Sequence, residues 1–162
     1  MRQVLTVCLG NYCRSPFAQV ALTRRGGSSV TVHSAGLIGK WQDQPANPSM
    51  INAAWRLGLD LTPHRAQQIT LEMLHCADKV LAMDAAVLET LQAICGEANA
   101  HKLGLYLPGR DVPDPIGQDD TAFNDCAVLI EAGTALHIGR DHPWRVSRNR
   151  WGGWCVVWAW VG

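Results

Sequence analysis

The stretch from Cys8 to Pro16, CLGNYCRSP, places a thiol, an arginine and a serine close together. Cys8 and Arg14 are separated by five residues, and Ser15 follows directly. A thiolate that attacks a phosphorus atom approaches oxygens that already carry negative charge, so the site must neutralise those oxygens. Arg14 suits this purpose, because its planar guanidinium can hold two phosphate oxygens at once. The stretch therefore predicts a phosphoryl-transfer site in which Cys8 is the nucleophile.

The loop between these residues would complete the anion site. A loop folded over the start of a helix points successive backbone N–H groups inward, at the positive end of the helix dipole. Gly10 provides the backbone freedom for such a turn, and Pro16 is suited to the first turn of the helix. The same positive field favours the thiolate form of Cys8, and Ser15 is placed to donate a hydrogen bond to that sulfur.

The flanking segments predict the elements that position this loop. Residues 3–9, QVLTVCL, are β-branched and leucine-rich, as in a strand buried on both faces, and helical spacing follows Pro16. Further strands are predicted over 30–33, 78–83 and 103–107, and helices over 49–57, 70–75, 85–94 and 121–138. This alternation predicts an α/β fold with a central four-stranded parallel sheet, helices on both faces, and the phosphate-binding loop after the first strand. Ligands bind such sheets at the carboxyl ends of the strands.

Composition limits the possible classes of protein. The 162 residues suit one compact domain, and 14 basic residues balance 14 acidic ones, which argues against a nucleic-acid partner. No apolar run is long enough for a secretory signal or a membrane span, so we expect a cytoplasmic protein without stable membrane insertion. The six cysteines form no closely spaced pair, which predicts free thiols and neither a metal nor another cofactor.

Several further segments follow the loop in an order that carries a resemblance. They are His33–Gly36 (HSAG), His64–Thr70 (HRAQQIT), Val80–Asp84 (VLAMD) and Val112–Pro115 (VPDP). Together with VCLGNYCRSP they make residues 3–136 resemble the low-molecular-weight protein tyrosine phosphatases. This ordered match is far more specific than a lone pair of cysteine and arginine.

The resemblance implies a hydrolase that forms a phosphocysteine on Cys8. Asp114 would protonate the departing phenolate and then activate water as a carboxylate, help that is typically worth about 10² to 10⁴ in rate. Arg14 would hold the transferring group together with the loop residues, which are Leu9, Gly10, Asn11, Tyr12, Cys13 and Ser15. The family mechanism requires no metal.

The resemblance also assigns supporting residues. Asn11, Ser34 and His64 would form a polar network beneath the loop, fixing its shape and orienting Ser15. Tyr12 and Trp41 would be walls that grip the substrate ring in a pocket deep enough to favour aryl phosphates. An anchor for its own loop is the other interpretation of Trp41.

The role of Cys13 is open. Cys13 either packs under the loop or forms a reversible disulfide with Cys8 that protects the nucleophile from over-oxidation.

The segment after the predicted general acid departs from the family. Many relatives have tyrosines after the Asp-Pro pair, whereas Ile116 and Gly117 follow it here. The rim opposite Trp41 therefore lacks an aromatic side chain.

The end of the chain departs from the family. We predict a phosphatase domain over residues 1–138 and an atypical tail over 139–162, in which five of the seven tryptophans fall between 144 and 160. The tail is either a surface for a membrane or a partner, or a divergent or frame-shifted extension, and its apolar segment WCVVWAW is β-prone.

The predicted partner is a phosphotyrosine-containing protein. Bacterial members of the family often oppose tyrosine kinases that control exopolysaccharide or capsule export, and the compact sequence resembles those members most. Two other functions compete with this one. An arsenate reductase of the same fold would need further cysteines for a disulfide relay, and Cys76 and Cys95 do not match one in spacing. A catalytically silent phosphotyrosine-binding module conflicts with the intact set of Cys8, Arg14 and Asp114.

Overall fold

The central sheet has four parallel strands. The structure, a computed structural model, describes residues 1–138 and the backbone of Trp144–Arg148 and Trp154–Trp158. The strands are β1 (Arg2–Cys8), β2 (Val30–Gly36), β3 (Lys79–Ala82) and β4 (Leu103–Leu105), in the order β2-β1-β3-β4. Every pairing in this sheet is parallel, which confirms the predicted architecture.

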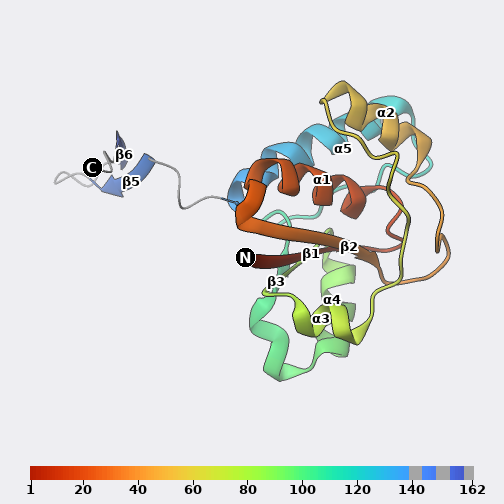
Figure 1. Ribbon diagram of the computed structural model, residues 1–162, viewed down its shortest axis with the longest axis horizontal. Coiled ribbons are helices and arrows are strands. Elements are labelled where there is room, and N and C mark those ends of the chain that lie inside the picture. Colours follow the sequence, from red (N-terminus) through yellow and green to blue (C-terminus); the bar gives the residue numbers. More distant parts are fainter. Residues whose placement is uncertain (139–143, 149–153, 159–162) are drawn as a thin grey trace.

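Helices cover both faces of the sheet (Figure 1). On one face lie α1 (Arg14–Gly26), α2 (Pro48–Arg56) and α5 (Asp120–Gly133). On the other lie α3 (Leu71–Cys76) and α4 (Ala85–Cys95). Short 3₁₀ turns, η1 (Gly27–Ser29), η2 (Glu97–Lys102) and η3 (Thr134–Leu136), follow α1, α4 and α5.

Strand β1 lies between two hydrophobic clusters. Val4 belongs to the cluster under α1, α2 and α5, whereas Leu5 belongs to the cluster under α3 and α4. Both side chains are at most 2% exposed. This burial on both faces explains why QVLTVCL lacks the alternation of a strand with one solvated face.

Some element boundaries differ from the sequence predictions. Strand β2 continues past His33 to Gly36, because Ser34, Ala35 and Gly36 pair in register with the end of β1. These small residues carry little local strand signal. The last helix ends at Gly133 and its final turn is 3₁₀, while β4 ends at Leu105 rather than 107.

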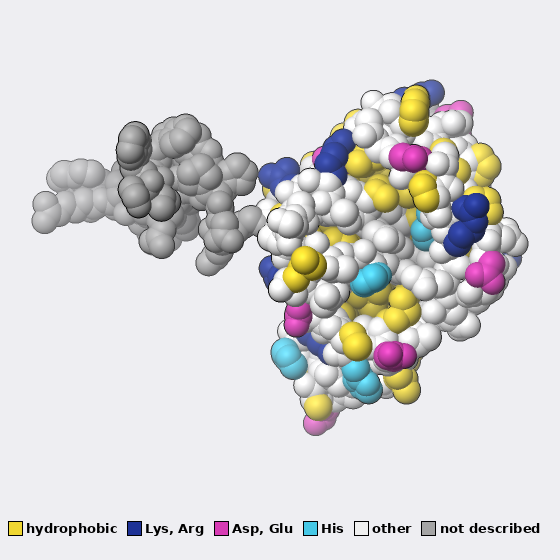
Figure 2. Space-filling view, in the orientation of Figure 1, with side chains coloured by type: hydrophobic (Ala, Val, Ile, Leu, Met, Phe, Trp, Pro, Cys, Tyr) yellow, Lys and Arg dark blue, Asp and Glu magenta, His cyan; other side chains and the backbone are white. Residues whose placement is uncertain are grey.

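Charged side chains are scattered rather than gathered on the face drawn in Figure 2, as the balanced composition would suggest. None of the helices among the described residues is long and apolar enough to cross a membrane. Strands β5 (Trp144–Arg148) and β6 (Trp154–Trp158) pair antiparallel. The predicted boundary at 138 and the interpretations of the tail otherwise lie outside the described residues and stay predictions.

Candidate active site

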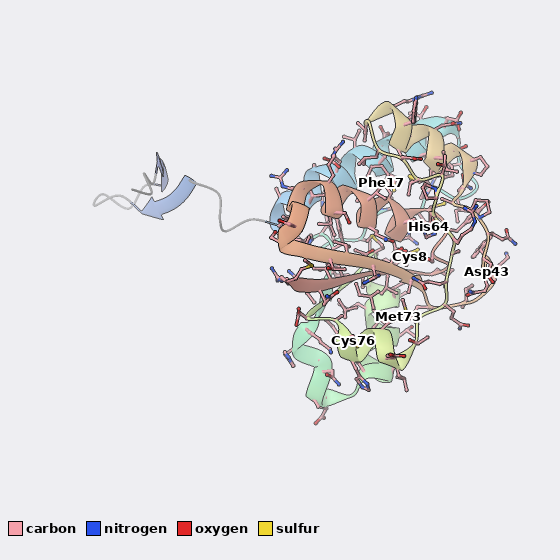
Figure 3. The ribbon with its side chains drawn as sticks, viewed as in Figure 1. Cys8, Phe17, Asp43, His64, Met73 and Cys76 are labelled. Carbon is pink, nitrogen blue, oxygen red and sulfur yellow. The ribbon has the colours of Figure 1, made fainter. Side chains whose placement is uncertain are left out.

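The predicted nucleophile lies where the first strand meets the first helix. Cys8 is the last residue of β1, a five-residue loop follows, and α1 begins at Arg14. This places Cys8 at the carboxyl end of the sheet, where Figure 3 shows it beneath Phe17 of α1. Its Sγ lies 3.1 Å from the Ser15 Oγ, and its side chain is almost fully buried. The predicted contact between Cys8 and Ser15 is therefore present.

The backbone of the loop uses its carbonyl groups and leaves its amide groups open. The carbonyls of Cys8, Leu9 and Tyr12 accept hydrogen bonds from the backbone amides of Leu37, Ile38 and Asn47, at 2.8 to 3.1 Å. Within residues 1–138, no acceptor is found for the amide groups of residues 9–15. Unsatisfied amides at the start of a helix form a site for an anion. The loop is thus suited to hold phosphate.

Asn11 organises the predicted network beneath the loop. Its backbone has a φ of 53°, in the left-handed region that asparagine tolerates. Its Nδ2 donates to the Ser15 Oγ at 3.0 Å and to the Ser34 Oγ at 2.9 Å, while its Oδ1 accepts from the Gln67 amide at 2.9 Å. The structure brings together the three network residues that the sequence predicted, and adds Gln67.

His64 completes this network through the backbone. Its Nε2 lies 2.9 Å from the Asn11 carbonyl oxygen, and Figure 3 shows it on the same side of the molecule as Cys8. Burial lowers the pKa of His64, so the ring is neutral at physiological pH and donates from Nε2 to that carbonyl. The histidine thereby fixes the peptide group that follows Asn11, the loop residue with a positive φ.

Close backbone contact explains the glycine that ends the HSAG segment. A Cβ on Gly36 would lie 2.6 Å from the Gly10 carbonyl carbon, so only glycine lets β2 approach the loop this closely. Two positions earlier, the Ser34 hydroxyl donates to the Gln19 Oε1 at 2.6 Å. Gln19 and Gln67 were not predicted, because neither has a local signal apart from its place in a helix or loop.

Arg14 is held between two carboxylates. Its Nη1 donates to the Asp84 Oδ2 and its Nη2 to the Asp114 Oδ2, both at 2.8 Å, and Nη1 also donates to the Val112 carbonyl at 2.9 Å. Burial by itself would lower the pKa of Arg14, but Asp114, Cys8 and Asp84 raise it overall. The guanidinium therefore stays charged despite its burial.

Asp84 was missed as a site residue by the sequence analysis. Its Oδ1 caps α4 by accepting from the Val87 amide at 2.8 Å, while its other oxygen pairs with Arg14. A carboxylate directly after the third predicted strand was the available signal. The carboxyl ends of parallel strands share one edge, where β1 also delivers Cys8.

The predicted general acid lies at the mouth of the site. The Asp114 side chain is 40% exposed, and its Oδ1 accepts from the Ile116 amide at 3.1 Å. A small cavity lies beside it. It is lined by Cys8, Leu9, Gly10, Tyr12, Cys13, Arg14, Trp41, Asp114 and Ile116. Asn11 and Ser15 lie in the network and do not line the cavity.

Two stacked rings form one wall of this cavity. The rings of Tyr12 and Trp41 are 5.2 Å apart and 10° from parallel. Lys40 covers the indole with its ammonium group 4.7 Å from the ring centre. A Cβ on Gly10 would lie 2.2 Å from the indole, so Trp41 rests directly on the phosphate loop. The geometry suits a pocket wall, and the contact with substrate stays a prediction.

The other described thiols differ from Cys8 in their surroundings. Burial raises the pKa of Cys13 and, for Cys126, raises the pKa to about 12, so both are neutral thiols. Cys8 and Cys13 are both free, and a disulfide between them stays a prediction. Cys76 ends α3 and Cys95 ends α4, near the amino ends of the strands and opposite Cys8. This placement does not suit a disulfide relay to Cys8.

Within residues 1–138 there is no group of three or more His, Cys, Asp or Glu side chains arranged to hold a metal ion. The site described above consists of a buried thiol, a charged guanidinium, open amides and a partly exposed carboxylate. That set is sufficient for nucleophilic attack, anion binding and proton transfer.

Comparison with known proteins gives a consistent result. Residues 3–139 match the family described as low molecular weight phosphotyrosine protein phosphatase. The chain is 36% identical over 142 residues to EpsP of Ralstonia nicotianae, a probable low molecular weight protein-tyrosine-phosphatase; the match covers 86% of this chain and 96% of EpsP. Among solved structures it resembles Wzb of Escherichia coli K30 in complex with sulphate, with a TM-score of 0.76, 33% identity, and coverage of 83% and 94%. Vibrio vulnificus Wzb in complex with benzylphosphonate gives a TM-score of 0.78, 30% identity, and coverage of 83% and 95%.

Proposed function

The chain belongs to the low molecular weight phosphotyrosine protein phosphatase family, and from this premise we propose that it hydrolyses phosphotyrosine in proteins through a phosphocysteine on Cys8. The observation that carries the proposal is the convergence of Cys8, Arg14 and Asp114 on one cavity under open backbone amides. The two Wzb structures support it, because one holds an oxyanion and the other an aromatic phosphonate.

The first step transfers the phosphoryl group to sulfur. The Cys8 thiolate attacks phosphorus, the bond between phosphorus and the tyrosine oxygen breaks, and that oxygen takes a proton from Asp114. The loop amides and Arg14 hold the three equatorial oxygens during the transfer. Substrate phosphate would take the Nη2 that now pairs with Asp114, which frees the Asp114 carboxyl to face the leaving oxygen.

The second step hydrolyses the phosphocysteine and regenerates the free enzyme. Asp114, now a carboxylate, takes a proton from a water molecule, whose oxygen attacks the phosphorus of the phosphocysteine. The bond between sulfur and phosphorus breaks, inorganic phosphate leaves, and Cys8 is again a thiolate. Ser15 stabilises that leaving sulfur from 3.1 Å, and Asn11 holds Ser15 in place. The network beneath the loop thus serves both steps.

The proposed partner is a tyrosine-phosphorylated protein, such as a bacterial tyrosine kinase acting in exopolysaccharide production. EpsP and the two Wzb proteins all come from bacteria, which supports a bacterial partner. Arsenate reduction is the competing activity, and the distance in the fold between Cys8 and the thiols of Cys76 and Cys95 argues against it.

One assay separates these functions. We would measure hydrolysis of para-nitrophenyl phosphate and of a phosphotyrosine peptide by the wild type, Cys8→Ser and Asp114→Asn, with arsenate reduction followed in parallel. Turnover of both phosphates that depends on Cys8, without arsenate reduction, supports the proposal. Peptide binding without turnover would indicate the silent binding module instead, and Cys8-dependent arsenate reduction would indicate the reductase.

A further inference from the structure

A second cavity lies on the other side of the loop that carries Asp114. It has a volume of about 230 Å³ and lies between that loop and α5. Its walls include Pro113, Pro115, Ala122 and Leu129, and Gln118 and Asp125 are its polar members. We call it the α5 groove. Nothing in the mechanism above uses it.

The α5 groove and the catalytic cavity share one wall. Asp114 and Ile116 line the catalytic cavity, whereas their neighbours Pro113 and Pro115 line the groove. The side chains of this loop thus alternate between the two cavities. An extended peptide advances about 3.3 to 3.6 Å per residue, so a residue within about three positions of a bound phosphotyrosine can reach across the loop.

The chain segment that borders the groove is acidic, although Asp114 within it pairs with Arg14. The fifteen residues from 111 to 125 include five aspartates and neither lysine nor arginine, although the whole chain is neutral. Two of these carboxylates cap backbone amides, since Asp111 accepts from Ala85 and Asp119 accepts from Ala122. Asp125 is exposed and lines the groove itself. Its carboxylate is available to a cationic group that enters from solvent.

Apolar walls with a carboxylate at the edge suit one kind of occupant. Lysine and arginine bury an aliphatic stem while their charged end stays near water. Proline, alanine and leucine side chains would contact the stem, and Asp125 would pair with the charge. A purely apolar side chain would leave this carboxylate unused, and an acidic one would be repelled by it.

We infer that the α5 groove is a substrate subsite that binds a lysine or arginine close to the phosphotyrosine. The inference rests on the proposed phosphatase function and adds a sequence preference to it. Because the groove contacts the peptide and not the phosphate, it affects protein substrates and leaves small aryl phosphates unaffected.

The test compares phosphotyrosine peptides that are identical apart from one residue. Alanine, lysine, leucine or glutamate is placed at each position within about three residues of the phosphotyrosine, and kcat/KM is measured. At the best position we expect the wild type to prefer lysine over alanine by roughly threefold to tenfold, as for a partly exposed ion pair with added apolar contact.

Three variants locate the effect. Asp125→Asn removes the charge in the groove, Ala122→Trp fills the groove, and Asp120→Asn removes an exposed charge outside its lining as the matched control. We expect the first two to reduce the lysine preference to below about twofold and the third to retain it. All three should hydrolyse para-nitrophenyl phosphate at the wild-type rate, which also reports that each variant is folded.

The outcomes are distinguishable. Equal loss in Asp120→Asn and Asp125→Asn, an equal preference for leucine, or no preference in the wild type would each overturn the subsite. A wild type that hydrolyses no phosphate ester would instead contradict the proposed function itself.

Discussion

Two buried polar clusters in this molecule differ in whether their hydrogen-bonding groups are left open or are all paired inside the protein. Beneath the phosphate loop, Asn11, Arg14 and Ser15 draw partners from several segments, and the loop amides remain open toward a cavity. After the end of α5, His137 is 6% exposed and both its ring nitrogens have partners inside the protein. Its Nε2 lies 2.6 Å from the Tyr106 carbonyl oxygen, and its Nδ1 lies 3.3 Å from the Lys79 Nζ.

The contrast between the two clusters indicates which buried polar groups serve catalysis and which serve stability. Hydrogen bonds that converge on a cavity and leave donors free prepare a site for an anion. Hydrogen bonds that use every donor and acceptor internally satisfy buried groups and hold elements together. Substitutions in the loop cluster should therefore change catalysis, and substitutions at His137 should change only stability.

The largest expected effect is at the nucleophile. Cys8→Ser should lower kcat for para-nitrophenyl phosphate by at least ~10⁴-fold, because a serine hydroxyl is not ionised in this site. Cys95→Ser, at the end of α4, is the matched control and should retain wild-type kcat. Substantial residual turnover by Cys8→Ser would place the nucleophile elsewhere.

Asp114→Asn should have the next largest effect. We expect kcat to fall by about 10² to 10⁴ with a poor leaving group such as phosphotyrosine, because the departing phenolate loses its proton donor. The loss should be smaller with para-nitrophenyl phosphate, whose phenolate leaves more easily without a proton. The same loss with both substrates would mean that Asp114 positions Arg14 and does not transfer a proton.

The His137 cluster should respond to pH through stability. Burial lowers the pKa of His137 to about 4, so protonation of its ring opposes folding. The contribution of the neutral ring to the free energy of unfolding is therefore fully present above about pH 6.5 and is lost as the pH falls. The loss between pH 6.5 and 4 should be about 3 kcal/mol, measured by urea unfolding.

A matched pair of variants isolates this contribution. His137→Gln retains an N–H that can donate to the Tyr106 carbonyl, and should flatten the dependence of the unfolding free energy on pH. The exposed His75→Gln should leave the dependence unchanged, and para-nitrophenyl phosphate turnover should be near wild type in both. An unchanged slope in His137→Gln would assign the acid sensitivity to other groups.

Ser34→Ala should change kcat by less than the Cys8 and Asp114 variants do, and stability by less than protonation of His137 does. It removes one acceptor of the Asn11 amide and the donor to Gln19, which should cost about 1 to 2 kcal/mol in unfolding free energy. Because Asn11 also holds Ser15, kcat should fall by roughly tenfold. Lost stability with an unchanged kcat would mean that the loop keeps its shape without Ser34.

The local parts of the site were predictable from the sequence. A buried strand, a short loop with glycine and a helix opening with proline predicted where Cys8 and Arg14 lie. The family resemblance supplied Asp114, Ser34 and His64, because a single sequence cannot indicate which distant loops meet.

Contacts between residues that are distant in sequence could not be predicted. The Arg14–Asp84 pair depends on β3 lying beside β1, and the contact of Gln67 with Asn11 depends on a loop more than fifty residues away. His137 likewise had no motif around it, and its partners, the Tyr106 carbonyl and the Lys79 ammonium, come from distant parts of the chain.

Direct detection of the phosphoenzyme would show whether Cys8 carries the phosphoryl group during turnover. The wild type would be quenched during turnover of para-nitrophenyl phosphate and mapped by peptide mass spectrometry, with Cys13→Ser used to assign the phosphate within the loop peptide. We predict one phosphate on Cys8, retained in Cys13→Ser and absent from Cys8→Ser. Phosphate on another residue, or continued turnover without a phosphorylated cysteine, would contradict the account.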